Sequence, residues 1–239
     1  MNQQLSISNR LQRIAAYLPR KPHFADIGSD HAYLPCYVCL IDDKAKAIAG
    51  EVVEGPFLSA KSTVKANQLE SAIDVRLGDG LAVVHHDEVK QVVIAGMGGP
   101  LIKSILENGI DKLGNVERII AQPNVDAKAV RKWLHNHGYE IVKEEIIEEN
   151  GHFYEIVVAD KMDIPQKLTE KEFMFGPILL LNKTTAFYEK WKTEQDKLYY
   201  VMKQMEQASV PQTEKLDRFT NELTWIEEVL HDEERDNES

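Results

Sequence analysis

The sequence His23-Phe-Ala-Asp-Ile-Gly-Ser-Asp-His-Ala-Tyr33 decides the fold of this 239-residue chain. It begins as a short apolar strand, passes through the carboxylate of Asp26 and through Gly28, and then enters a predicted helix. A glycine at such a turn lets the backbone bend tightly and come close to a ligand. The loop amides and the N-terminus of the following helix face that ligand in α/β folds. The stretch therefore predicts the first strand–loop–helix unit of a nucleotide-binding α/β fold.

The loop lacks the G-x-G-x-x-G pattern of dinucleotide-binding folds. It is nearer to the D-x-G-x-G-x-G pattern of S-adenosylmethionine (SAM) methyltransferases, with Asp30 at the second glycine position and Ala32 at the third. Aspartate adopts a positive φ at modest cost, so the turn survives this change. Alone, the departed pattern also fits an ordinary strand–helix turn, and the segments that follow decide between the two interpretations.

The composition predicts one medium-sized domain with an addition, or two small domains. Hydrophobic residues make up 43% of the chain and charged residues 28%, which is enough for a sizeable core. The chain has neither an apolar run of membrane-spanning length nor a signal-peptide pattern at its start, so we expect a cytoplasmic protein. Cys36 and Cys39 form a C-x-x-C pair. Zinc would need a second such pair, so we interpret both as core residues and expect no metal.

The formal net charge of −11 is unfavourable for a nucleic-acid binder taken as a whole. Residues 1–25 differ, because they contain four basic residues and no acid. The spacing of apolar residues predicts an amphipathic helix over residues 5–18, capped by Ser8 and ended by Pro19. Its basic side is compatible both with nucleic-acid contact and with a solvated face. The basic residues are Arg10, Arg13, Arg20 and Lys21.

Acidic residues follow the next two predicted strands. The second strand, residues 46–51, ends in Glu51, which is 25 positions after Asp26. An acid there is placed to accept hydrogen bonds from ribose hydroxyls. The third strand, residues 73–77, is followed by Gly78-Asp-Gly80. In this fold class an aspartate at that position often reaches the adenine amino group.

A glycine-rich loop follows the fourth predicted strand, residues 91–95. It reads Gly96-Met-Gly-Gly-Pro100. Three glycines in four positions at the end of a buried parallel strand bring the backbone close to a ligand, although tight packing alone would also explain them. The fifth strand, residues 118–121, is followed by Gln122-Pro-Asn124.

Two further strands complete the predicted sheet. Residues 139–147 and 152–159 are joined by Glu149-Asn-Gly151, which is a hairpin signal. The count gives a seven-stranded, mostly parallel sheet with an antiparallel hairpin, the methyltransferase variant of the doubly wound fold. The composition changes after Asp163, so we predict a methyltransferase domain over residues 1–162 and a helical domain over residues 163–239.

The second predicted domain is an α-helical coiled-coil hairpin. A long helix is expected from Pro177 to about residue 207, then a turn at residues 209–212 and a second helix. Apolar residues of the first helix keep roughly heptad spacing: Phe187, Trp191, Leu198, Val201 and Met205. Lysines recur there every seven residues and form one stripe, which would either follow RNA phosphates or pair with acids of the second helix. They are Lys183, Lys190 and Lys197.

These motifs together resemble the bacterial tRNA (adenine-22) N1-methyltransferases, the TrmK family. The resemblance spans roughly residues 5–160 and continues into the helical hairpin. The segments that carry it are Leu11, Asp26-Ile-Gly-Ser-Asp-His-Ala-Tyr-Leu-Pro35, Gly50-Glu51 with Gly55-Pro56, Arg76-Leu-Gly-Asp-Gly-Leu81, Ala95-Gly-Met-Gly-Gly99, Gln122-Pro-Asn124 and Tyr154-Glu155. The resemblance implies a Rossmann-like class I SAM methyltransferase domain followed by a coiled coil. It also implies methylation of N1 of adenine 22 in the tRNA D-arm, with SAM as the donor.

The motifs then assign the expected site residues. The base pocket and reacting region are expected to include Asp30, His31, Gly96, Met97, Gly98, Gln122 and Asn124. The donor site is expected to include Asp26, Gly28, Ser29, Asp30, His31, Glu51, Val52, Gly78, Asp79, Gly80, Ala95 and Gly96. Because unpaired adenine N1 carries a free lone pair, the reaction needs positioning and no obligatory general base.

Two other functions also fit parts of the sequence. A small-molecule SAM methyltransferase would explain the donor loop but neither the basic N-terminal segment nor the helical hairpin. The second alternative, from a different class, is a non-catalytic tRNA-binding or assembly protein that retains SAM. We expect tRNA as the partner, no membrane association and a monomer.

Overall fold

The computed structural model describes residues 5–163, 166–206 and 213–237. The chain divides into two compact units, Met1–Ile178 and Leu179–Ser239. The predicted domain boundary after residue 162 falls earlier than this division, because α6 (Glu170–Phe175) groups with the first unit. The domain limits themselves stay a prediction.

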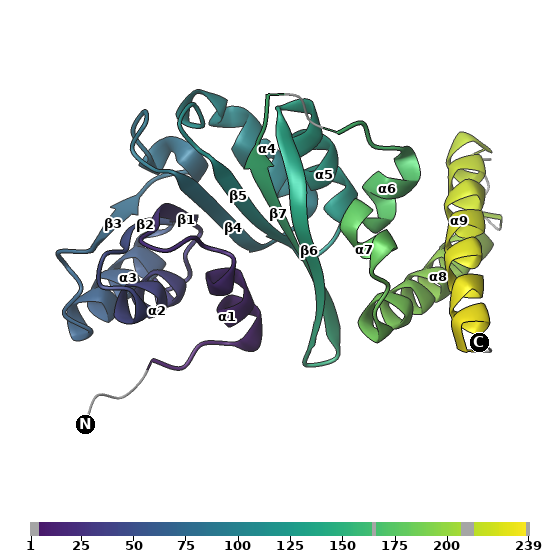
Figure 1. The fold of residues 1–239 in the computed structure, drawn as a ribbon, viewed down its shortest axis with the longest axis horizontal. Coiled ribbons are helices and arrows are strands. Elements are labelled where there is room, and N and C mark those ends of the chain that lie inside the picture. Colours follow the sequence, from purple (N-terminus) through teal and green to yellow (C-terminus); the bar gives the residue numbers. More distant parts are fainter. Residues whose placement is uncertain (1–4, 164–165, 207–212, 238–239) are drawn as a thin grey trace. The chain divides into compact units, whose positions relative to one another are not determined.

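The first unit contains a seven-stranded mixed sheet in the order β3-β2-β1-β4-β5-β7-β6 (Figure 1), which confirms the predicted fold class. The first five strands are parallel, whereas β7 is antiparallel to both β5 and β6. Asn150 and Gly151 join β6 to β7 with positive φ angles of 55° and 75°, as a tight hairpin turn requires. The strands are β1 (His23–Ile27), β2 (Lys46–Glu51), β3 (Ile73–Leu77), β4 (Gln91–Met97), β5 (Arg118–Pro123), β6 (Tyr139–Glu149) and β7 (His152–Lys161).

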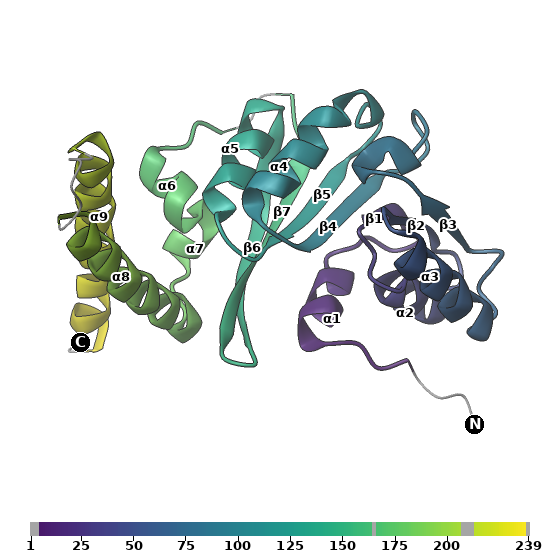
Figure 2. The ribbon, with the colours of Figure 1, turned by 180° about the vertical axis from the view of Figure 1, so that it is seen from behind.

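Helices cover both faces of the sheet, because successive strand residues point to opposite sides. Ala25 and Ile27 face a core formed with α4 and α5, whereas Phe24 faces a second core formed with α1, α2 and α3. Figures 1 and 2 show the sheet from its two sides, with these helices against it. Their bounds are α1 (Asn9–Ala16), α2 (Tyr33–Ile41), α3 (Glu54–Ala66), α4 (Gly99–Asn108) and α5 (Ala127–Asn136); short 3-10 helices cover Gly80–Val83 and Ile110–Lys112.

The two cysteines are core residues, as predicted. Cys36 and Cys39 lie in α2 and are buried in the core between that helix and the sheet. Burial raises the pKa of Cys36 to about 12 and that of Cys39 to about 11, so both stay protonated thiols at neutral pH. Within the described ranges, no helix is long and apolar enough to cross a membrane.

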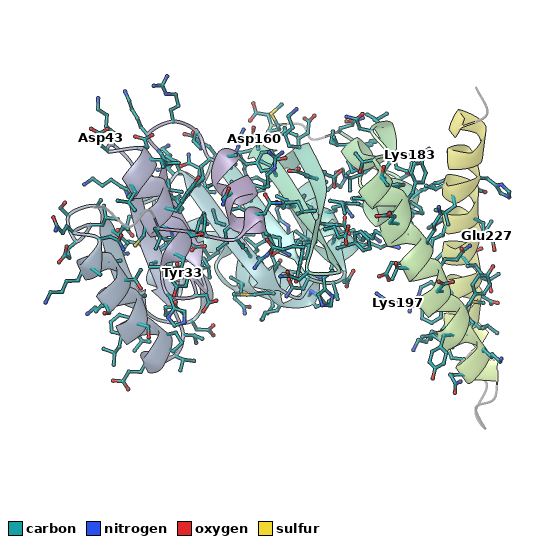
Figure 3. All side chains as sticks on the ribbon, turned by 90° about the horizontal axis from the view of Figure 1, so that it is seen from below. Tyr33, Asp43, Asp160, Lys183, Lys197 and Glu227 are labelled. Atoms are coloured by element: carbon teal, nitrogen blue, oxygen red, sulfur yellow. The ribbon has the colours of Figure 1, made fainter. Side chains whose placement is uncertain are left out.

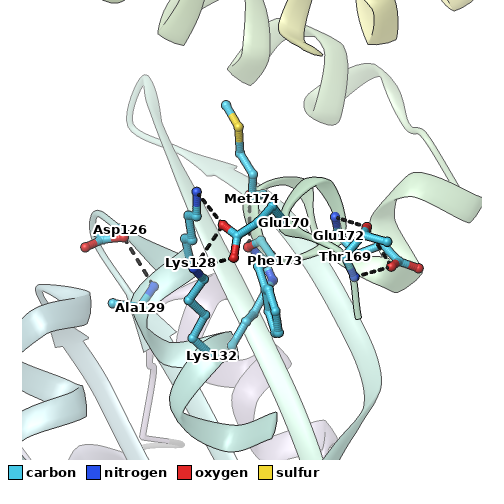
Figure 4. Close-up of polar contacts among 10 residues, drawn as sticks. Asp126, Lys128, Ala129, Lys132, Thr169, Glu170, Glu172, Phe173 and Met174 are labelled. Carbon is cyan, nitrogen blue, oxygen red and sulfur yellow. Dashed lines mark hydrogen bonds and ion pairs between the residues drawn. The ribbon is translucent and has the colours of Figure 1, made fainter. Parts of the chain in front are cut away.

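The segment after the sheet is fastened to α5 by polar contacts (Figure 4). Thr169 and Glu172 form the predicted capping box at the start of α6. Lys132 and Lys128 of α5 both reach Glu170, with Nζ–O distances of 2.6 and 3.3 Å. Since these side chains are partly exposed, each pair contributes under ~1 kcal/mol.

A buried arginine makes the stronger link. Arg131 of α5 is fully buried and donates from Nε to Glu144 of β6 at 2.6 Å, and its guanidinium also binds Glu155 of β7. The same guanidinium donates to the carbonyls of Phe173 and Met174, at 3.3 and 3.2 Å. A buried charge needs such partners, since leaving it unpaired would cost several kcal/mol. This cluster therefore fixes the end of α6 against the sheet.

The second unit contains two long helices that pack together, α8 (Thr185–Glu206) and α9 (Thr213–Asn237) (Figure 3). The predicted continuous helix from Pro177 is instead α7 (Pro177–Leu181) followed by α8, because the hydroxyl of Thr184 accepts from the Phe187 amide at 3.3 Å and starts a new helix. Val201, predicted in the apolar seam, is 38% exposed. The predicted turn at residues 209–212 lies outside the described residues.

Candidate functional site

The candidate site lies where the strand order reverses, between β1 and β4. In open α/β sheets, ligands bind outside the carboxyl ends of the strands at this point. The loop after β1 contains Gly28 with a φ of 69°, and the end of β4 contains Gly96 with a φ of 77°. The two loops touch, because a Cβ on Gly28 would lie 2.3 Å from Cε of Met97. The predicted donor loop and the predicted base loop thus face each other.

The donor side is built on two buried carboxylates. Asp26 at the end of β1 is 4% exposed and accepts a hydrogen bond from Ser29 Oγ at 2.6 Å. Glu51 at the end of β2 is 5% exposed and accepts one from the His31 amide at 3.2 Å. Asp30, His31 and the next residue all have positive φ, as the missing glycines of the loop pattern require. This strained turn presents the loop toward Glu51.

The donor side is strongly acidic. Burial raises the pKa of Asp26 to about 7; the Ser29 hydroxyl opposes this shift, and the charges of Glu51 and Asp30 add to it. Burial also raises the pKa of Glu51, while the His31 amide lowers it. His31 Nε2 lies 3.4 Å from a carboxylate oxygen of Asp30. Buried carboxylates without a cationic partner favour the binding of a positively charged ligand.

The remaining predicted donor residues end neighbouring strands at the same edge. Val52 follows β2 and is 62% exposed. The Gly78 amide donates to the Glu51 carbonyl at 2.8 Å, which holds the loop after β3 beside β2. Asp79 is exposed and precedes the 3-10 helix that begins at Gly80. Ala95 lies in β4 next to the bulge described below.

The base side is an amide network around Gly96. This residue is a bulge, because β4 pairs with β5 through Ala95 and Met97 and skips the residue between them. The Gly96 amide donates to Gln122 Oε1 at 3.1 Å, and its carbonyl accepts from Asn124 Nδ2 at 2.8 Å. Gln122 Nε2 then donates to Asn124 Oδ1 at 3.1 Å. The side chains of Gln122 and Asn124 thus bind both the amide and the carbonyl of Gly96.

Arg10 joins this network from α1. Its guanidinium binds Gln122 Oε1 and lies 5.2 Å from the centre of the Tyr154 ring, and the predicted RNA contact of Arg10 stays a prediction. Its Nε is buried and has no hydrogen-bond partner among the described residues; the nearest carboxylate oxygen of Glu149 is 3.9 Å away. The basic composition of residues 1–25 gave no signal of this inward direction.

Gly98 and Gly99 of the base loop are glycines for different reasons. Gly99 is required by packing, since a Cβ there would lie 2.0 Å from the Asp126 carbonyl oxygen. Gly98 has a φ of −69°, which any residue adopts, and a Cβ there would meet nothing closer than 3.7 Å. The protein itself therefore does not require a glycine at position 98. A Cβ there would make ordinary contacts with Val125 and Pro100, and without it the backbone of Gly98 can be approached closely by a ligand.

The other basic residues predicted to bind RNA do not gather at this edge. Arg13 is 47% exposed and pairs with Glu145 at 2.9 Å. Arg20 and Lys21 precede β1, so they lie at the amino end of the strands, opposite the site. They line a surface cavity with Asp43, which follows α2 at the end away from Tyr33 (Figure 3).

The three lysines of the predicted stripe are engaged within their own unit, and Lys183 precedes α8, so only Lys190 and Lys197 belong to that helix. Lys183 Nζ lies 2.5 Å from Asp232 of α9, and Lys197 Nζ lies 2.8 Å from Glu194 of the same helix. Lys190 Nζ lies 3.9 Å from the centre of the Trp191 ring. These contacts favour the intramolecular interpretation for Lys183, and RNA contact by the stripe stays a prediction.

Comparison with known proteins gives the family. The sequence profile described as TrmK, tRNA (adenine(22)-N(1))-methyltransferase, matches residues 24–228. The chain belongs to the TrmK family. The Bacillus subtilis (strain 168) tRNA (adenine(22)-N(1))-methyltransferase is 42% identical over 233 residues, 95% of this chain and 98% of the relative.

Two solved structures agree with this family over nearly the whole chain. Sp1610 of Streptococcus pneumoniae, solved in complex with S-adenosyl-L-methionine, gives a TM-score of 0.83 at 41% identity and covers 95% of this chain and 100% of that chain. M. capricolum TrmK, solved in complex with S-adenosyl-homocysteine, gives a TM-score of 0.83 at 28% identity, with 94% and 98% covered.

Two glycine substitutions in this TrmK family member should behave in opposite ways. Gly99→Ala forces a Cβ against a backbone carbonyl and should lower the free energy of unfolding by about 1–3 kcal/mol. Gly98→Val should change it by less than about 0.5 kcal/mol, yet it should abolish methyl transfer by blocking the close approach of the base to this backbone. Denaturant unfolding and a methylation assay measure both effects. A Gly98→Val variant with full activity would remove this loop from the pocket.

Proposed function

We propose that this chain binds SAM between Gly28 and Glu51 and transfers the methyl group to N1 of adenine 22 of tRNA, with the base held beside Gly96 and Gly98. The activity is that of the TrmK family, to which the chain belongs over residues 24–228. The observation that carries the residue assignment is the meeting of two loops at the β1–β4 reversal. The loop after β1 is acidic, and hydrogen bonds to amide side chains fix the backbone at the end of β4.

The acidic loop fits the charge of the donor. SAM carries a sulfonium and an ammonium against one carboxylate, so it is a net cation. Asp26, Glu51 and Asp30 supply negative charge around the donor loop. Glu51 is the acid placed to bind the ribose hydroxyls, since it ends the second strand. The narrow turn at Gly28 lets the loop amides approach the rest of the ligand.

The amide network fits the needs of the acceptor. SAM supplies an electrophilic methyl group, and adenine N1 attacks it with a lone pair while the electrons of the breaking C–S bond stay on sulfur. No proton has to leave in that step, so the work of the protein is to orient the base. Gln122 and Asn124 fix Gly96, and polar groups fixed before the reaction avoid reorganisation during it. His31 is accordingly a contact residue and not an obligatory general base.

One assay tests this function against the alternatives. Purified protein, labelled SAM and either tRNA or a metabolite mixture should give labelled tRNA alone, with the label mapped by nuclease digestion to N1 of adenine 22. Label in small molecules would support the small-molecule methyltransferase instead. SAM binding without any transfer to tRNA would support the non-catalytic alternative.

SAM affinity should depend on pH through Asp26. In the free protein its pKa is raised to about 7, and a bound cation would lower it. Binding therefore releases a proton near neutral pH, so affinity rises with pH and levels off above the pKa of the free protein. SAM should bind about tenfold more weakly at pH 6 than at pH 8. Calorimetry in matched buffers measures this, and Asp26→Asn should flatten the profile. An unchanged profile in that variant would separate Asp26 from the donor.

Arg10 and Arg13 form a matched pair for the base side. Arg10→Gln removes the guanidinium from Gln122 and should lower kcat roughly 10- to 100-fold, the equivalent of a lost hydrogen bond to a charged group. Its effect on the salt dependence of tRNA binding should be small, because the side chain faces inward. Arg13 is more exposed, so Arg13→Gln should leave kcat near wild type and flatten the salt slope if it meets a phosphate.

One outcome of comparing Arg10→Gln with Arg13→Gln would contradict this role of Arg10. If Arg10→Gln flattened the salt slope and left kcat unchanged, Arg10 would be a phosphate contact, and the network would not position the base. Arg10→Lys retains the charge without the planar guanidinium. If its kcat lies between those of Arg10→Gln and wild type, charge alone is not sufficient, and Arg10 also orients Gln122.

A further inference from the structure

Two apolar side chains are exposed near the loop that contains Gly98. Val125 follows β5 and is 66% exposed, and Leu101 in the first turn of α4 is 53% exposed. A Cβ on Gly98 would lie 3.7 Å from Val125 Cγ2, so the Val125 side chain borders the proposed entrance for the adenine. The Leu101 amide donates to the Gly98 carbonyl at 3.0 Å, which places the backbone of Leu101 beside the same loop.

The backbone around Val125 is held on both sides. The Val125 carbonyl accepts from the Gly99 amide at 2.8 Å, and the Asn124 amide donates to the Met97 carbonyl at 2.7 Å. Asp126 has a φ of 53° and caps α5 through the Ala129 amide at 3.2 Å. An exposed valine on so constrained a loop gains little from burial within the fold. Single exposed apolar residues are common on protein surfaces, but this one is held rigidly on a loop beside the proposed base pocket, where a bound base can contact it.

Methyl transfer to a base of folded tRNA requires a protein surface that contacts the neighbouring bases. An enzyme that modifies a base must extract it from its stack, which costs free energy. Proteins that separate stacked bases often insert apolar side chains such as leucine or isoleucine between them. The nucleotides that flank the extracted adenine must lie at the entrance of the pocket, beside the loop of Val125 and the first turn of α4, which contains Leu101.

We propose that Val125 and Leu101 form a wedge that fills the place vacated by the target adenine and supports the neighbouring bases. This rests on the proposed base pocket at Gly96 and Gly98. The wedge acts on the conformation of the RNA and not on the methyl donor. It makes extraction of the base easier and has no part in the chemical step.

The test compares two tRNA substrates. One is the intact transcript, and the other carries an abasic residue opposite the target adenine, which weakens its pairing beforehand. The double variant Val125→Ala, Leu101→Ala should lose roughly tenfold or more in kcat/KM on the intact transcript and much less on the weakened one. SAM affinity should stay unchanged. With 2-aminopurine at the target position, wild type should raise the fluorescence on binding, and the double variant should not.

A matched control is Ile41→Ala. Ile41 ends α2 at the amino end of the strands and is 64% exposed, so it tests the loss of exposed apolar surface away from the site. It should leave both substrates and the fluorescence unaffected. Each exposed substitution should leave the melting temperature of the protein nearly unchanged.

Three outcomes would overturn the wedge. Equal losses on both substrates with a normal fluorescence rise would show that the two side chains do not act on base extraction. Full activity of the double variant on the intact transcript would show that they do not act at all. A change in the particle mass of the double variant by light scattering would indicate a protein interface instead. Failure of wild type to methylate either tRNA would refute the proposed function itself.

Discussion

Parallel pairing of β1 with both β2 and β4 is the constraint on which the rest of this structure depends. From β1 the chain continues to β2 and β3 on one side, and it then returns to place β4 and β5 on the other side. The connections after β1 and β4 therefore leave in opposite directions, so no connecting helix covers the space between these two loops. They must face each other, and Met97 lies against Gly28 as a result. Every polar group of the candidate site belongs to a strand end or loop beside this reversal or to α1, which covers one face of it.

Charge divides the two halves of the site. The donor half contains carboxylates that burial makes costly to ionise, whereas the acceptor half presents amides and the guanidinium of Arg10. Methyl transfer moves a positive charge from the donor to the base. In the proposed assignment the by-product on the acidic side is neutral, so the carboxylates attract it less strongly than they attract SAM.

Much of the fold could be predicted from the sequence because its signals are local. Acids that directly follow short apolar strands, such as Asp26 and Glu51, marked the edge of the sheet, and Asn150-Gly151 marked the hairpin. The direction of Arg10 could not be predicted, since its partner Gln122 lies 112 positions away. Arg131 was missed for a different reason, because an arginine on an amphipathic helix is normally solvated. The break between α7 and α8 did have a signal, the cap at Thr184, but the apolar run before it resembled one continuous helix.

The contact between Arg10 and Gln122 has a consequence for the modularity of the enzyme. The sheet and its crossover helices, from β1 to β7, hold the whole donor half of the site. They do not hold the whole acceptor half, because α1 lies before the first strand and supplies a side chain to it. The smallest catalytic fragment is therefore larger than the smallest SAM-binding fragment. In the proposed assignment Arg10, upstream of the Rossmann-like core, belongs to the acceptor half, so removing α1 would remove the side chain that binds Gln122.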